Sequence, residues 1–158
     1  MEEDLSRGSA GTLPLDVVAV LAESAFFADF TTEQLESLAP RFRVVSHPQG
    51  SEIYNLGDRA ADFYVLVEGL VSFTIGRDSR QASAGEVIRG GEVFGWAAVV
   101  ERAQRRIATA YCITPCKLLV IDGNEFLRLM DEDHSVGYHI MKQLTFLITG
   151  ALTAFASG

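Results

Sequence analysis

The middle of the chain, residues 41–89, is a succession of short segments of β-type sequence separated by turn residues. Val71, Phe73 and Ile75 alternate with small polar residues, which is the period of a strand with one buried face. In the segment 63–67 almost every side chain is apolar or aromatic, so both faces of that strand are expected to be at least partly buried. Short strands with glycine turns at this spacing are typical of a sandwich or a barrel.

Helical patterns stand on both sides of this β region. Thr31 and Gln34 have the spacing of a capping box, which predicts a helix beginning after Thr31. Asp122 is a candidate cap for a short helix, and a longer helix is expected from about Ser135 towards Phe155. The predicted organisation is a flexible tail at 1–13 and a single domain at 14–158, with helices at 14–40, a β-roll at 41–122 and C-terminal helices at 123–155.

Length and charge limit the classes of function. A chain of 158 residues with 48% hydrophobic residues suits one domain with a substantial core. The formal net charge of −8 argues against nucleic acid as a partner, since such proteins need a positive field. A local basic cluster of Arg102, Arg105 and Arg106 on this acidic chain favours a small anion instead.

The remaining chemistry-bearing residues give weaker signals. Cys112 and Cys116 are too few for a disulfide scaffold or a structural zinc site, and inert thiols are expected. His47, His134 and His139 lie at a turn and on late helices, so no metal site is expected. The sequence has no motif context for a catalytic triad or carboxylate pair, and the protein is expected not to be an enzyme. It also has no evident signal peptide or membrane span, so a cytoplasmic location is expected.

The stretch GEVFGWAAVVERAQRRIATA, residues 91–110, combines glycine turns, a short apolar run and an arginine pair. A glycine turn lets backbone N–H groups approach an anion closely, and guanidinium groups bind phosphate oxygens with charge-assisted hydrogen bonds. The residues alone therefore indicate a possible anion site. By composition alone, a solvated loop charge is the favoured interpretation of Arg106.

Three features together resemble the cyclic nucleotide-binding domain family, which includes catabolite-activator-type regulators, kinase regulatory subunits and gated channels. They are LGDRAADFYVLVEGLVSF at 56–73, the stretch at 91–110, and the strand–helix–helix ending. The resemblance implies a mostly β fold: an eight-stranded β-roll of the double-stranded β-helix or jelly-roll kind, with helices before it and a long helix after it. It also implies a regulatory or sensor domain, with cyclic AMP or cyclic GMP as candidate effectors.

In that family the segment similar to 94–110 is the phosphate-binding cassette. The resemblance assigns the phosphate contact to Arg106, whereas Trp96 stands where the family has a ribose-binding acid. An indole offers one N–H donor and no acceptor, so about 1.5–3 kcal/mol of ribose binding is expected to be lost. The Trp96 ring could stack on a ligand or fill its space. The predicted ligand-contact residues are Phe94, Gly95, Trp96, Ala97, Arg105, Arg106, Ile107 and Ala108.

The last helix carries no charged side chain from Gln143 onwards. Its apolar residues form a seam with alternating spacings of three and four, which is typical of helix pairing. In the resembling family this helix dimerises and covers the ligand, so a homodimer is expected, with Thr149 and Thr153 as weak candidates for base contacts. The alternative is a dimerising interaction module with a non-functional pocket. The seam residues are Met141, Leu144, Ile148, Ala151 and Phe155.

Overall fold

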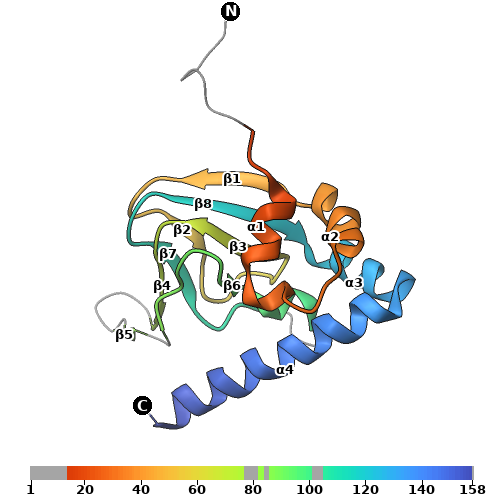
Figure 1. Cartoon of the computed structure of the whole chain (residues 1–158). Coiled ribbons are helices and arrows are strands. Elements are labelled where there is room, and N and C mark those ends of the chain that lie inside the picture. Colours follow the sequence, from red (N-terminus) through yellow and green to blue (C-terminus); the bar gives the residue numbers. More distant parts are fainter. Residues whose placement is uncertain (1–13, 77–81, 84–85, 101–104, 158) are drawn as a thin grey trace, which may run out of the picture.

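The structure, a computed structural model of the chain, describes residues 14–76, 82–83, 86–100 and 105–157. Its centre is a roll of two four-stranded antiparallel sheets (Figure 1). One sheet has the order β1-β8-β3-β6 and the other has the order β2-β7-β4-β5. The strands are β1 (Arg43–His47), β2 (Glu52–Tyr54), β3 (Asp62–Glu68), β4 (Val71–Ile75), β5 (Ala82–Ser83), β6 (Val93–Phe94), β7 (Thr109–Cys112) and β8 (Cys116–Asp122).

The predicted mostly β fold with flanking helices is therefore confirmed, with β5 and β6 only two residues long each. The alternation at Val71–Ile75 appears as β4. Strand β3 is buried on both faces over Phe63–Leu66, as its apolar sequence predicts. Its neighbour β8 pairs with it from Asp122 to Lys117 and with β1 on its other edge, so β8 is a central strand of its sheet.

The helix starts follow the local capping signals. Thr31 Oγ1 accepts from the Gln34 N–H at 3.1 Å, and Gln34 Oε1 accepts from the Thr31 N–H at 2.9 Å, which confirms the capping box. Asp122 Oδ1 accepts from the N–H groups of Asn124 and Glu125. The helices are α1 (Val17–Glu23), η2 (Ala25–Phe27), α2 (Thr32–Leu38), η3 (Ala39–Arg41), η5 (Trp96–Val99), α3 (Gly123–Glu132) and α4 (His134–Ser157).

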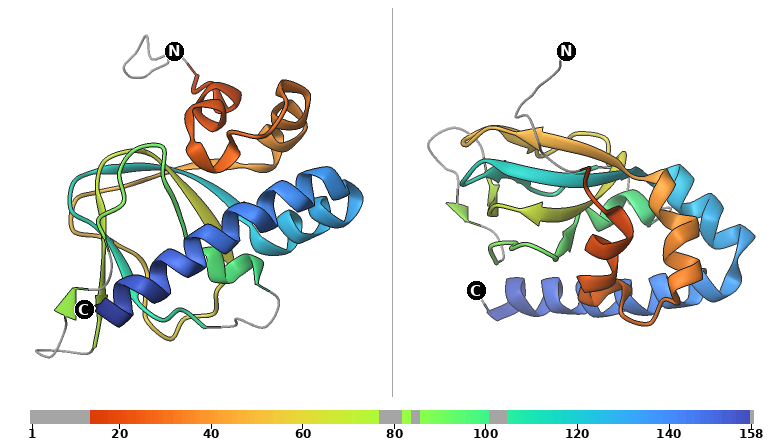
Figure 2. Two further views of the ribbon diagram at one scale, coloured as in Figure 1. Left: turned by 60° about the horizontal axis from the view of Figure 1, so that its bottom comes forward. Right: turned by 45° about the horizontal axis from the view of Figure 1, so that its top comes forward.

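Helix α4 lies along one side of the roll, with its N-terminal half beside α3 and the N-terminal helices (Figure 2). Lys142 forms an ion pair with Asp29 at 3.0 Å, which links α4 to the segment between η2 and α2. The larger apolar core joins the N-terminal helices, the β1-β8-β3-β6 sheet and the inward face of α4. From α4 it takes Val136, Ile140 and Leu144.

The predicted dimer seam does not lie on one exposed face of α4. Leu144 is 1% exposed and belongs to the core of its own chain, whereas Met141 is 50% exposed. Ile148 is partly buried, and Ala151 and Phe155 have side chains outside the described part. The reason is that Val136, Ile140 and Leu144 pack on the chain's own core, so the helix face that carries Leu144 is turned towards the interior.

Among the described residues, no helix combines the length and the hydropathy that a membrane span requires.

Candidate functional site

The stretch at 91–110 begins with a tight backbone around Gly95. This residue has φ 80° and directly precedes η5, and a Cβ atom there would lie 2.8 Å from Cδ2 of Tyr64. Only glycine adopts this conformation without strain, and only glycine leaves room for the Tyr64 ring. Phe94, one residue earlier, stacks on Tyr64 with ring centroids 4.9 Å apart. Sheet packing thus fixes where η5 starts.

The arginine end of the stretch is held by the loop at 56–58. The Arg106 N–H donates to the Asp58 carbonyl at 2.8 Å, and the Gly57 N–H donates to the Arg106 carbonyl at 2.9 Å. The exposed side chain of Arg105 donates to the Gly57 carbonyl at 3.3 Å. The sequence motif that begins at residue 56 and the arginine end of the stretch at 91–110 therefore lie against each other. Arg102 lies outside the described residues.

Arg106 points into the molecule and is only 5% exposed. Its Nη1 donates to the Gly95 carbonyl at 3.1 Å, and its Nη2 donates to the Asp62 carbonyl at 2.5 Å. Its Nε is buried without a hydrogen-bond partner in the described part of the chain. A guanidinium carries five N–H donors, so the two hydrogen bonds to carbonyl groups satisfy only part of its bonding capacity.

The cation lies among aromatic rings. The Arg106 Cζ atom is 4.1 Å from the centroid of the Tyr54 ring and 5.9 Å from that of Tyr64. Burial raises the pKa of Tyr54 to about 12, although the nearby charge of Arg106 opposes the increase. Burial also raises the pKa of Tyr64, assisted by the negative charge of Asp62. Both phenols are therefore neutral near pH 7 and do not compensate the charge of Arg106.

No described carboxylate forms an ion pair with Arg106. The Asp62 side chain instead pairs with Arg43 at 3.2 Å, and the Asp58 side chain accepts from the Asn55 N–H at 2.9 Å. Burying an ion without a counter-charge costs several kcal/mol unless hydrogen bonds or a ligand offset it. Two carbonyl acceptors and the face of Tyr54 supply part of that compensation. An anion would supply the rest.

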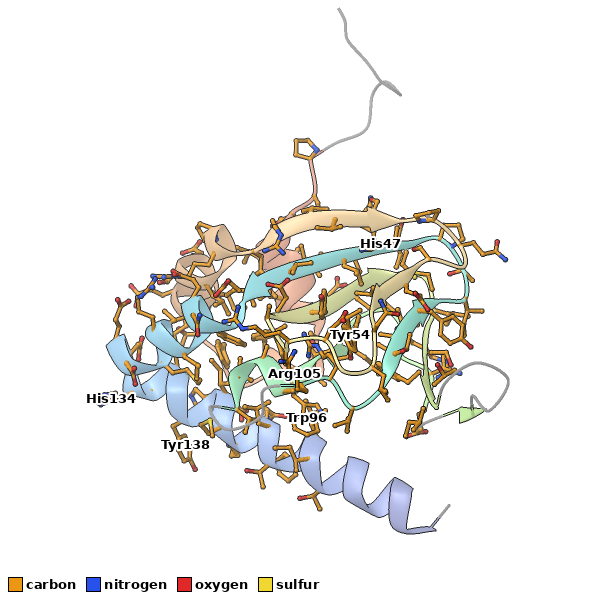
Figure 3. The ribbon with its side chains drawn as sticks, turned by 180° about the vertical axis from the view of Figure 1, so that it is seen from behind. His47, Tyr54, Trp96, Arg105, His134 and Tyr138 are labelled. Atoms are coloured by element: carbon orange, nitrogen blue, oxygen red, sulfur yellow. The ribbon has the colours of Figure 1, made fainter. Side chains whose placement is uncertain are left out.

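The other predicted contact residues lie around this arginine in different settings. Trp96 is partly buried, packs against the larger core, and lies beside α4 in Figure 3. Ala97 is partly buried and Ala108 is buried. Ile107 is among the exposed large apolar residues, as expected where Arg106 and Ala108 on either side of it point inward. Thr149, on α4, is exposed, and the side chain of Thr153 lies outside the described part.

Two close contacts connect this site to the C-terminal helices. Gly123, the first residue of α3, packs directly on η5: a Cβ atom there would lie 2.3 Å from the Ala98 carbonyl oxygen. Gly137 on α4 approaches α3 in the same way, with Met130 O at 3.0 Å from the position of an added Cβ. The absence of side chains at these two glycines lets η5 approach α3, and α3 approach α4, at backbone contact.

The contacts described for Arg106 involve neither a cysteine nor a histidine. Cys112 and Cys116 are free and buried, and burial raises the pKa of Cys112 to about 11, so its reactive thiolate is disfavoured. His47 and His134 lie at opposite ends of the molecule in Figure 3. In the described part of the chain, no group of three or more His, Cys, Asp or Glu residues is arranged to hold a metal ion.

Sequence reasoning missed Tyr54 and the carbonyl groups of Gly95 and Asp62 as partners of Arg106. Tyr54 reaches Arg106 because β2 pairs with β7, the strand that follows Arg106, with Tyr54 opposite Ala110. A strand pairing of this kind was the only available signal for Tyr54. Backbone acceptors leave no signal, because every residue type carries a carbonyl group.

Comparison with solved structures places this site in a known fold. The N-terminal domain of a transcriptional regulator from Streptomyces coelicolor has 22% identity and a TM-score of 0.69, with 82% of this chain and 92% of that one covered. The catabolite activator protein of Thermus thermophilus has 20% identity and a TM-score of 0.71, with 84% and 62% covered. The regulatory domain of Toxoplasma gondii PKA, crystallised with cAMP, has 21% identity and a TM-score of 0.68, with 82% and 48% covered.

The TM-scores of these structures establish the fold, and the family profile establishes the family. No curated protein matches the chain. The family profile "Cyclic nucleotide-binding domain", however, matches residues 44–133, which include seven of the eight strands in full, the arginine stretch and α3. The chain therefore belongs to the cyclic nucleotide-binding domain family.

Proposed function

We propose that this regulatory domain is a sensor that binds a small phosphate-bearing or other anionic effector through Arg106. One observation carries the proposal: the Arg106 guanidinium is buried, has an unpartnered Nε, and has no carboxylate partner among the described residues. Binding of an anion would neutralise this charge with charge-assisted hydrogen bonds.

Cyclic AMP and cyclic GMP are the first effectors to consider. The family match and the cAMP in the Toxoplasma gondii PKA structure support them. Trp96 opposes them, because its indole cannot accept a hydrogen bond from a ribose hydroxyl. Arg106 would then hold the phosphate, and the sugar would be bound weakly.

The route from the site to α4 would run through α3. Ala98 in η5 touches Gly123 at the start of α3, and Met130 in α3 touches Gly137 in α4. Because these contacts involve backbone atoms, a displacement of η5 cannot be absorbed by a side-chain rotation alone. We therefore infer that effector binding biases the position of α4.

Replacing Trp96 with glutamate tests the site, because the affinity for cyclic AMP is expected to increase. A carboxylate at this position can accept from a ribose hydroxyl, and cyclic AMP should bind roughly 10- to 100-fold more tightly than to the unmodified protein. The measurement is calorimetric titration of both proteins with cyclic AMP and cyclic GMP, with thermal unfolding to verify the fold. Trp96→Gln is the matched control, because it removes the same ring without adding charge. Equal affinities of the glutamate and glutamine variants would contradict the ribose assignment.

A dimerising module is the second candidate function, and exposed apolar residues on α4 favour it. Tyr138, Met141 and Phe146 are all exposed. Of these three residues only Met141 belongs to the predicted seam. A homodimer would therefore use the exposed outer face of α4 and not the whole seam. Met141→Glu is expected to give monomers in sedimentation, because a charge at the interface would have to be desolvated. Met141→Leu should sediment as the parent does. A Met141→Glu variant that sediments with the same mass as a dimeric parent would rule out this face of α4 as the dimer interface.

A cytoplasmic location stays a prediction of the sequence.

A further inference from the structure

Among the described residues, Tyr54 makes the shorter of the two aromatic contacts of Arg106, and it lies on a strand distant in sequence from Arg106. Its ring centroid is 4.1 Å from Arg106 Cζ, within the range of a strong cation–π contact. Tyr54 belongs to β2, at the edge of the second sheet, and packs in the smaller core cluster. The contact thus joins the arginine to the frame of the roll.

The geometry of a guanidinium separates two kinds of contact. In a cation–π contact the charged group lies over the face of an aromatic ring, as Arg106 Cζ lies over the Tyr54 ring, whereas hydrogen bonds are made by the N–H donors. In Arg106 the in-plane donors reach the carbonyl groups of Gly95 and Asp62, and Nε is left without a partner. The Tyr54 contact is separate from these two hydrogen bonds, and it can restrict the orientation of the group.

We propose that Tyr54 is a positioning residue that holds the Arg106 guanidinium in the orientation required for binding an anion. This inference rests on the proposed function. Tyr54 is itself held by other aromatic rings, because its ring centroid lies 5.8 Å from that of Tyr64 and 6.3 Å from that of Phe94. Burial keeps the Tyr54 phenol neutral by raising its pKa to about 12, so the residue does not compete with the effector as a counter-ion.

The first test measures the chemical shift of the Arg106 side chain and needs no ligand. In the full chain, the Arg106 Nε–H proton should show an upfield ring-current shift in a ¹H–¹⁵N spectrum. Tyr54→Phe keeps the ring and should keep the shift. Tyr54→Leu should lose most of it, and Tyr54→Met provides a second ring-free variant if the leucine variant does not fold. Phe73→Leu is the matched control: its ring packs at 5.9 Å from Phe94 in the same cluster, so its loss should leave the Arg106 signal in place.

The second test measures binding, with cyclic AMP and inorganic phosphate as the probes. Tyr54→Leu should bind roughly tenfold more weakly than the parent protein, and Tyr54→Phe should bind within about twofold of it. A merely structural tyrosine would lower the stability of both ring-free variants without changing the affinity of the folded protein for either probe.

The outcomes separate the two proposals. An unchanged Arg106 shift in Tyr54→Leu, or an equal loss in Phe73→Leu, overturns the positioning role whether or not an anion binds. A parent protein with the expected shift that binds neither probe contradicts the proposed function, and with it the role of Tyr54 in binding. Loss of shift and affinity in Tyr54→Leu, with both retained in Tyr54→Phe, supports the inference.

Discussion

Arg106→Gln is expected to remove detectable anion binding. Truncating one partner of a buried, hydrogen-bonded charge pair costs about 2–5 kcal/mol, which corresponds to a loss of roughly 30- to several-thousand-fold in affinity. The measurement is calorimetric titration with cyclic AMP, performed on the Trp96→Glu background if the parent binds too weakly for a precise constant. This prediction depends on the burial of the Arg106 guanidinium, whose described partners are only carbonyl groups and aromatic rings.

Arg105→Gln is the matched control for this prediction. It removes the same charge one residue earlier, where the side chain is exposed and donates a hydrogen bond to the Gly57 carbonyl. Its affinity should stay within about threefold of the parent, because exposed charges interact weakly. Chemical denaturation completes the test: Arg106→Gln should change the free energy of unfolding by less than about 1.5 kcal/mol, since losing the hydrogen bonds is offset by losing a buried charge. Strong destabilisation with unaltered binding would identify Arg106 as a structural residue.

Gly123→Ala should produce the largest change in stability. An added Cβ atom would lie 2.3 Å from the Ala98 carbonyl oxygen and 3.0 Å from the Ala98 Cβ. Neither neighbour can yield by rotating a side chain, so η5 or α3 must move as a unit. We expect a loss of about 2–4 kcal/mol in the free energy of unfolding, measured by urea denaturation. Because η5 follows Gly95, effector affinity should decrease as well.

Gly150→Ala provides the opposite case on the same chain. Gly150 lies within α4, and no heavy atom lies within 4 Å of an added Cβ. Alanine is the better helix former, so this variant should be about 0.5–1 kcal/mol more stable than the parent. A Gly123→Ala variant as stable as Gly150→Ala would show that η5 does not pack on α3 as the structure has it.

Local signals were sufficient for much of the fold. Thr31 with Gln34, and Asp122 with the two residues that bond to it, are capping motifs whose members lie within three residues of one another. The alternation in β4 likewise needs only five neighbouring residues. Such patterns are predictable from sequence because the interacting residues are separated by a fixed, short number of positions.

The site was predictable only in part. The importance of Arg106 was inferred from a motif, but its neighbours come from strand pairing and from backbone carbonyl groups, which have no side-chain signature. The seam on α4 shows a related limit. Leu144 and Met141 have equally good helical spacing, and only the position of the core decides that Leu144 points inward. Periodicity identifies the stripes of a helix without identifying what each stripe meets.

The central position of β8 also has a consequence for how the chain folds. The only described strand that pairs with β1 is β8, and β8 also forms the longest ladder of β3. During synthesis β1 and β3 therefore emerge long before the strand that joins them, and the arginine stretch emerges before its frame is complete. Closing such distant pairings carries a large loop-closure entropy, which slows folding. The effector site should thus be acquired late, in the same cooperative step that seats β8.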